Sequence, residues 1–121
     1  MSRPAVVQAG YVSPAAAALV QEIQPHVTLL RTAMAPSQRI LSARILAGCR
    51  HASSDAVKQV LFKACTTDPC PLVRACCIDE LCKLGFYDPA FLAHLHDACA
   101  DPDDDVRTSA KEALNKMVPR K

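Results

Sequence analysis

Several residue types and motifs on which enzymes depend are scarce in this chain of 121 residues. It has no tryptophan, and its three glycines, Gly10, Gly48 and Gly85, lie too far apart to form a phosphate-binding loop. Neither a GxSxG nucleophile motif nor a His-Glu pair of the kind found in some metal-binding hydroxylases is present. We therefore expect no catalytic residues and no enzymatic activity.

Long hydrophobic runs and an excess of one charge are also missing. The apolar run at residues 15–20 is too short for a transmembrane span or the core of a signal peptide. Lys and Arg number 14 against 12 Asp and Glu, and the two signs are mixed along the chain. Such a balance creates no long-range field for nucleic acid or an anionic membrane, and no tryptophan is available to stack on bases. We expect a cytoplasmic protein that binds neither.

Cysteine is abundant but forms no recognisable site. The seven cysteines are Cys49, Cys65, Cys70, Cys76, Cys77, Cys82 and Cys99. The odd count argues against a disulfide framework, and no CxxC pair offers the usual zinc spacing. Cys65, Cys77 and Cys99 fit small buried positions, which leaves Cys70 as the best candidate for an exposed thiol. We predict no metal and no cofactor, while adjacent Cys76 and Cys77 stay open as a soft-metal or redox pair.

What the chain does contain is an internal repeat. Residues 68–74 read Asp-Pro-Cys-Pro-Leu-Val-Arg, and 33 residues later residues 101–107 read Asp-Pro-Asp-Asp-Asp-Val-Arg. Each stretch separates two amphipathic patterns, because proline disfavours helix in the residue before it and the acidic residues can cap the next helix. A repeat of this length is typical of stacked helical units, which bury their apolar faces only against neighbouring units.

The spacing of apolar residues predicts a helical hairpin in each unit. The first helices are expected around residues 57–65 and 91–99, and the second around residues 73–84 and 106–117. A fainter third copy precedes them, with helices expected at residues 25–34 and 36–49, and a further short helix is expected at residues 13–23. In that copy Arg39 falls 35 residues before Arg74.

On these residues the chain resembles the HEAT-repeat proteins, of the short bacterial type. Their pattern Asp-Pro-x-x-x-Val-Arg-x-x-Ala-x-x-Ala-Leu is met almost completely by residues 101–114, and by residues 68–81 with Cys and Glu in the two Ala positions. The resemblance covers roughly residues 26–118 and implies an all-α fold, a right-handed α-α superhelix of about three helical hairpins. It also implies that four repeat residues are structural and bond between neighbouring units. These are Asp68, Arg74, Asp101 and Arg107.

Polar residues replace apolar ones on one face of the last unit. Thr108, Lys111 and Asn115 stand where the preceding unit has Ala75, Ile78 and Cys82, and His94 and His96 replace Val60 and Phe62. A terminal unit needs such a polar face because nothing stacks on it. We therefore predict that the array ends here and that both histidines are solvated cap residues.

We predict one repeat domain over residues 13–118, after a flexible or capping segment at residues 1–12 and before a basic tail at residues 119–121. The resemblance implies a non-enzymatic scaffold or adaptor that binds another protein through the concave side, where the second helices lie. Candidate contact residues there are Arg39, Asp79, Lys83, Lys111, Glu112 and Lys116. A homo-oligomer is a further expectation, because so few units leave the first hairpin in need of cover. The alternative is an accessory enzyme or ligand-binding protein, similar to bilin lyases or dependent on a metal or thiol.

Overall fold

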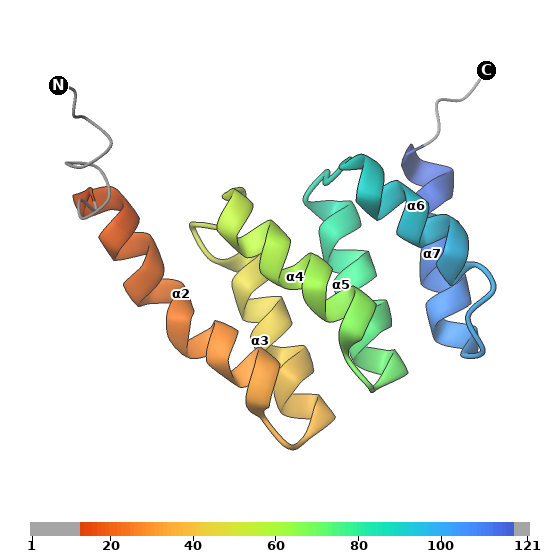
Figure 1. Cartoon of the computed structure of the whole chain (residues 1–121), viewed down its shortest axis with the longest axis horizontal. Helices are drawn as coiled ribbons and strands as arrows, with labels where there is room; N and C mark the ends of the chain where they lie inside the picture. The colour runs from red at the N-terminus through yellow and green to blue at the C-terminus, as the bar shows by residue number, and fades with distance from the viewer. Residues whose placement is uncertain (1–12, 118–121) are drawn as a thin grey trace, which may run out of the picture.

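The computed structural model describes residues 13–117, which form six helices and no strand. The helices are α2 (Pro14–Thr32), α3 (Pro36–Gly48), α4 (Asp55–Thr67), α5 (Pro71–Lys83), α6 (Pro89–Ala98) and α7 (Asp104–Met117). They pair in chain order into three hairpins, α2 with α3, α4 with α5 and α6 with α7 (Figure 1). The predicted all-α array of three helical hairpins is confirmed.

Local sequence signals account for where the first helices begin. The hydroxyl of Ser13 accepts a hydrogen bond from the N–H of Ala16 at 3.1 Å, and a carboxylate oxygen of Asp88 accepts one from Ala90 at 2.8 Å. These side chains satisfy backbone donors that have no partner inside the helix. Proline follows each of them at the first helical position, where its missing N–H costs nothing.

The predicted boundary at Pro25 is wrong, because α2 is one helix that continues through this proline. Ile23 and Val27 are buried on either side of it, so both halves of the helix are anchored in the same core. Pro25 itself is exposed, and so is Gln21, whose carbonyl loses its helical donor. Water can reach that carbonyl, and the packing of the two halves offsets the missing bond.

The helices form two layers of different density. In Figure 1 the first helices α2, α4 and α6 lie in front of the second helices α3, α5 and α7. In the second layer, α5 packs extensively against both α3 and α7. In the first layer, α2 and α4 contact at few positions and α6 packs mainly on α7. The second helices are therefore closer together, which places them on the concave side of the array.

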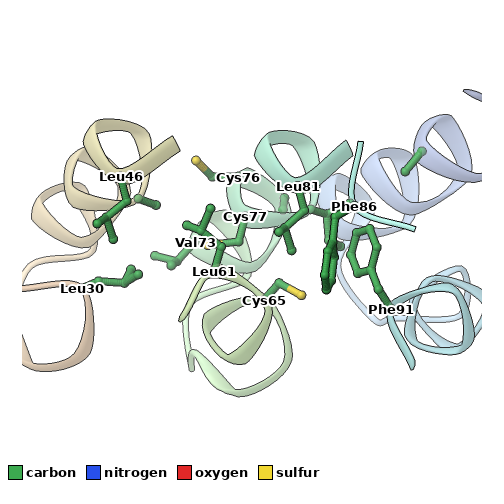
Figure 2. Close-up of a cluster of buried hydrophobic side chains, with 14 of the residues drawn as sticks. Leu30, Leu46, Leu61, Cys65, Val73, Cys76, Cys77, Leu81, Phe86 and Phe91 are labelled. Carbon is green, nitrogen blue, oxygen red and sulfur yellow. The ribbon is translucent and has the colours of Figure 1, made fainter. Parts of the chain in front are cut away.

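The core lies between the two layers. Figure 2 shows the second helices above and the first helices below, with a row of buried side chains between them. Leu30, Leu46, Leu61, Leu81 and Leu95 are each at most 2 % exposed. Burying a side chain of this size contributes roughly 1.5–3 kcal/mol, so this row holds the two layers together.

All three phenylalanines of the chain gather at one place, between α4 and α6. The ring centroids of Phe62 and Phe91 are 5.8 Å apart, and those of Phe86 and Phe91 are 5.3 Å apart. Large side chains therefore fill the space that the sparse backbone contact between these two helices leaves open. Gly85, at φ +70°, ends α5 in the left-handed conformation and lets the chain turn toward this cluster.

The two ends of the array differ in polarity. At the C-terminal end, Thr108 and Lys111 are exposed, whereas Ala75 and Ile78 at the matching positions of α5 are buried. At the N-terminal end, Leu41 of α3 is 54 % exposed, although Cys76 at its matching position in α5 is buried. The predicted polar face on α7 is thus confirmed, while the first unit presents apolar side chains instead.

The prediction for the two histidines is right for His96 and wrong for His94. His96 is exposed. His94 is half-buried, its ring lies 6.4 Å from that of Phe62 at an interplanar angle of 70°, and its Nε2 is buried without a hydrogen-bond partner. The reason is its place in the repeat: it matches Val60 and faces the preceding unit, so the aromatic cluster covers it.

Candidate functional site

Ion pairs between the turns join one unit to the next. Arg39 of α3 donates to both carboxylate oxygens of Asp68, through Nε at 2.8 Å and Nη2 at 3.1 Å. Its Nη1 donates to the carbonyl oxygens of Ala33 and Met34 at 2.7 and 3.2 Å. The Asp68 carboxylate holds the pKa of Arg39 above its usual value. This bidentate pair fixes the relative position of the first two units.

Arg39 is therefore not a surface contact residue, and that prediction is wrong. Its side chain is 10 % exposed and that of Asp68 is 5 % exposed. The two charges are buried together in the turn, where no partner protein can reach them. A signal for this was present in the sequence, because Arg39 lies 35 residues before Arg74 and so occupies the structural arginine position of the repeat.

The same arrangement recurs one unit further on. Arg74 reaches Asp101 with Nη2 at 3.4 Å from each carboxylate oxygen, and its Nη1 donates to the carbonyl oxygen of Asp68 at 2.9 Å. In the last unit Arg107 donates to the carbonyl oxygen of Asp101 and pairs with Asp104 of its own helix. Each arginine thus bonds to its own turn, and the first two also bond to the aspartate of the next turn.

Sequence comparison agrees with this architecture. A family model of HEAT repeats matches residues 23–115. The chain belongs to the HEAT-repeat family. Comparison with curated proteins and with solved structures finds no match. HEAT repeats are in general non-enzymatic modules for protein interaction and scaffolding, so the surfaces of this HEAT array are where a function is to be sought.

A shallow hollow of about 400 Å³ lies on the concave side of the HEAT array, over α5 and between α3 and α7. The lining residues that determine its charge and polarity are Arg44, Leu72, Cys76, Asp79, Asp105 and Glu112. Leu72 is 52 % exposed, and the three acidic side chains and Arg44 line the same hollow at exposed positions of α3, α5 and α7. The hollow therefore combines an accessible apolar side chain with a mainly acidic border.

The structure brings together two of the six predicted contact residues, Asp79 and Glu112, in this hollow. Lys83 and Lys116 are exposed and lie four residues further along α5 and α7, which puts them on the same face one turn away. Lys111 is also exposed, but it matches buried Ile78 and so lies at the open C-terminal end.

Three residues of the hollow escaped sequence reasoning: Arg44, Leu72 and Asp105. Arg44 occupies the same repeat position as Asp79, 35 residues later, and Glu112, 68 residues later. Leu72 occupies the same repeat position as Asp105, 33 residues later. The repeat spacing was thus a signal that could have found them.

The cysteines give the site no evident reactivity. Burial raises the pKa of the Cys76 thiol, with nearby Arg44 acting in the opposite direction, and it raises the pKa of Cys77 further. Cys70, expected to be exposed, is half-buried. Within residues 13–117 no group of three or more metal-ligating side chains comes together, and none of the helices there is long and apolar enough to cross a membrane.

Proposed function

We propose that this HEAT array is a scaffold or adaptor module that binds a partner protein across α3, α5 and α7. The observation that carries the proposal is the exposure of Leu72 inside a hollow on the concave side. A large apolar side chain in a concave, polar-bordered position is the kind of feature around which protein interfaces form. Self-association, expected from the small number of units, remains a separate proposal that the hollow does not require.

The charges around Leu72 indicate the kind of partner segment. Asp79, Asp105 and Glu112 lie toward α5 and α7, and Arg44 lies on α3. A segment that places an apolar side chain on Leu72 and Lys or Arg beside the three carboxylates complements this border. Rim charges of this kind act mainly on the rate and specificity of association, while the apolar contact supplies most of the affinity.

The test compares variants of the full chain as bait in the native cell lysate, with mass spectrometry of the proteins that co-purify. Leu72→Arg should abolish recovery of a stoichiometric partner, because it removes the apolar contact and adds a positive charge that repels Lys or Arg of the partner. Leu41→Arg is the matched control, since Leu41 is equally exposed but lies at the N-terminal end. A partner that Leu72→Arg still captures would refute the proposal.

We also propose that the module works in the cytoplasm. All seven cysteines are free thiols, as is usual in a reducing compartment.

A further inference from the structure

A second hollow lies on the opposite side of the array, in the first-helix layer. It is a groove of about 460 Å³ between α2 and α4, within the size range of sites that hold ligands or inserted side chains. Leu30, Val60, Ala64 and Pro69 give it an apolar lining. Its position makes it independent of the concave surface that the proposed function uses.

The matching space between α4 and α6 is filled by a large side chain that α2 does not carry. Ile23 and Val27 of α2 match Val57 and Leu61 of α4 in burial and spacing, so Thr28 matches Phe62. Phe62 reaches across to α6 and packs on Phe91. Thr28 is exposed, and its hydroxyl accepts a hydrogen bond from Gln24 on its own helix at 3.1 Å. Aromatic rings therefore fill the space between α4 and α6, whereas no aromatic side chain lines the groove between α2 and α4.

The charge around this groove is positive. Arg31 of α2 and Lys63 of α4 line it from its two sides, and both are exposed. Neither has an acidic partner in the described part of the chain. The one carboxylate in the lining is Asp68, whose charge is taken up by the buried pair with Arg39. The groove thus has two cations free to pair with an incoming ligand.

We propose that the groove between α2 and α4 binds an acidic segment of a partner protein, which inserts one large apolar or aromatic side chain between the two helices. Its carboxylates pair with Arg31 and Lys63, while the inserted side chain covers Leu30, Val60 and Ala64 in the way that Phe91 covers Phe62. Charge complementarity selects this occupant over the chain's own ends. Residues 1–12 contain Arg and no acidic residue, and residues 118–121 contain Arg and Lys.

The experiment selects ligands without assuming their identity. Short random peptides displayed on phage are selected on the full-length protein, and a recovered peptide is measured by fluorescence anisotropy. We expect recovered peptides to carry an aromatic or large aliphatic residue beside several Asp or Glu. Replacing the acids by Lys, or the apolar residue by Ala, should abolish binding. Failure to recover acidic peptides would overturn the proposal, whereas basic peptides that Leu72→Arg no longer binds would belong to the concave surface.

Variants of the protein then locate the site. Arg31→Glu with Lys63→Glu should raise the Kd of a selected peptide about tenfold or more, because like charges then face each other. Ala64→Phe, which enlarges a side chain in the lining, should weaken binding by filling the groove. Lys111→Glu with Lys116→Glu makes the same change of charge on α7 and should leave the Kd unchanged. Peptide binding that the groove variants do not affect would contradict the proposal.

Two more controls distinguish the groove from the concave surface and from a contact between two copies of the chain. Leu72→Arg should leave peptide binding intact, so that failure of the concave-surface proposal and failure of this one are distinguishable. Sedimentation velocity of the wild type and of the Arg31→Glu, Lys63→Glu variant tests whether a second copy occupies the groove. Self-association that only the wild type shows would assign the groove to contact between copies and overturn the proposal.

Discussion

At the scale of single residues, two equivalent ion pairs differ in their surroundings. The pair of Arg39 and Asp68 is buried and bidentate, with side chains 10 % and 5 % exposed. The pair of Arg74 and Asp101 is longer, at 3.4 Å, and its side chains are 20 % and 18 % exposed. Because removing one partner of a buried pair leaves an uncompensated charge, these two aspartates should differ in their effect on stability.

We predict that Asp68→Ala lowers the free energy of unfolding by about 3–5 kcal/mol, and that Asp101→Ala lowers it by about 1–2 kcal/mol. Each aspartate also accepts one backbone N–H in its turn at 2.9 Å, so that loss is common to both variants and cancels in the comparison. Urea denaturation followed by circular dichroism measures the difference. Equal losses in the free energy of unfolding would show that the burial of the pair of Arg39 and Asp68 does not add to its effect on stability.

His94 offers a second prediction at this scale. Its Nε2 is buried without a partner beside Phe62, so His94→Leu should raise the free energy of unfolding by about 1 kcal/mol by removing an unsatisfied polar atom. His96→Leu is the control and should change little, because His96 is exposed. Thermal unfolding of the two variants checks this, and a destabilised His94→Leu would point to a hydrogen bond that the ring makes in solution.

At the scale of the elements, α2 differs from the other helices in length and in containing a proline beyond its first turn. It has 19 residues, whereas α3, α4 and α5 have 13 each. Glu22 of α2 forms hydrogen bonds with Arg50 and His51, and these bonds hold α2 to the loop after α3. Arg50 lowers the pKa of Glu22 to about 2, so this pair persists down to low pH.

We predict that Pro25→Ala stabilises the fold by about 1–3 kcal/mol, since it restores a helical hydrogen bond at an exposed position. Pro36→Ala, at the first position of α3, should have a much smaller effect because no such bond exists there. Equilibrium unfolding in urea gives both values. A destabilising Pro25→Ala would mean that the proline shapes α2 in a way the core requires.

At the scale of the whole molecule, cohesion depends on rows of small and apolar side chains between successive second helices. Ala75 and Ile78 of α5 are buried, on the face that the matching residues Thr108 and Lys111 leave exposed on α7. Cys76 is buried on the side of α5 toward α3 (Figure 2). In the last unit the positions of Ala75 and Ile78 hold the polar residues Thr108 and Lys111, which are exposed. A single position can therefore be compared inside the array and at its end.

Ile78→Asp should lower the free energy of unfolding by more than about 3 kcal/mol, because it buries an unpaired charge between α5 and α7. The matching substitution at the open end, Lys111→Asp, should change stability by less than about 0.5 kcal/mol. The melting temperatures of the two variants provide the test. An unchanged melting temperature for Ile78→Asp would refute the stacking of α7 on α5.

Alkaline pH should weaken the same core. Burial raises the pKa of the Cys65 thiol from 9.0 to about 12, and it raises those of Cys76 and Cys77 as well. Their folded-state pKa values lie above the unfolded ones, so their contribution to stability is complete below about pH 9 and is lost as pH rises toward the folded values. Urea titrations at several pH values should show this fall, with a shallower slope in Cys65→Ala.

The hairpins, their helix caps and the structural residues of the turns could be predicted from the sequence alone. Those features rest on interactions within one unit or repeated in every unit, so apolar spacing, Asp-Pro turns and the Arg positions encode them directly. Asp68, Arg74 and Asp101 lie where that pattern placed them. The helical hairpin is in this sense a local property of the chain.

Only the tertiary structure decided which side chains are reachable. Arg39 is buried because the second unit supplies its aspartate, and His94 is covered because Phe62 of the preceding hairpin lies against it. Pro25 lies inside a helix because the core holds both halves of α2. The hollow around Leu72 and the groove between α2 and α4 likewise arise from the spacing of neighbouring units. Exposure depends on what stacks against a residue, and that is a property of the assembled array rather than of any one segment.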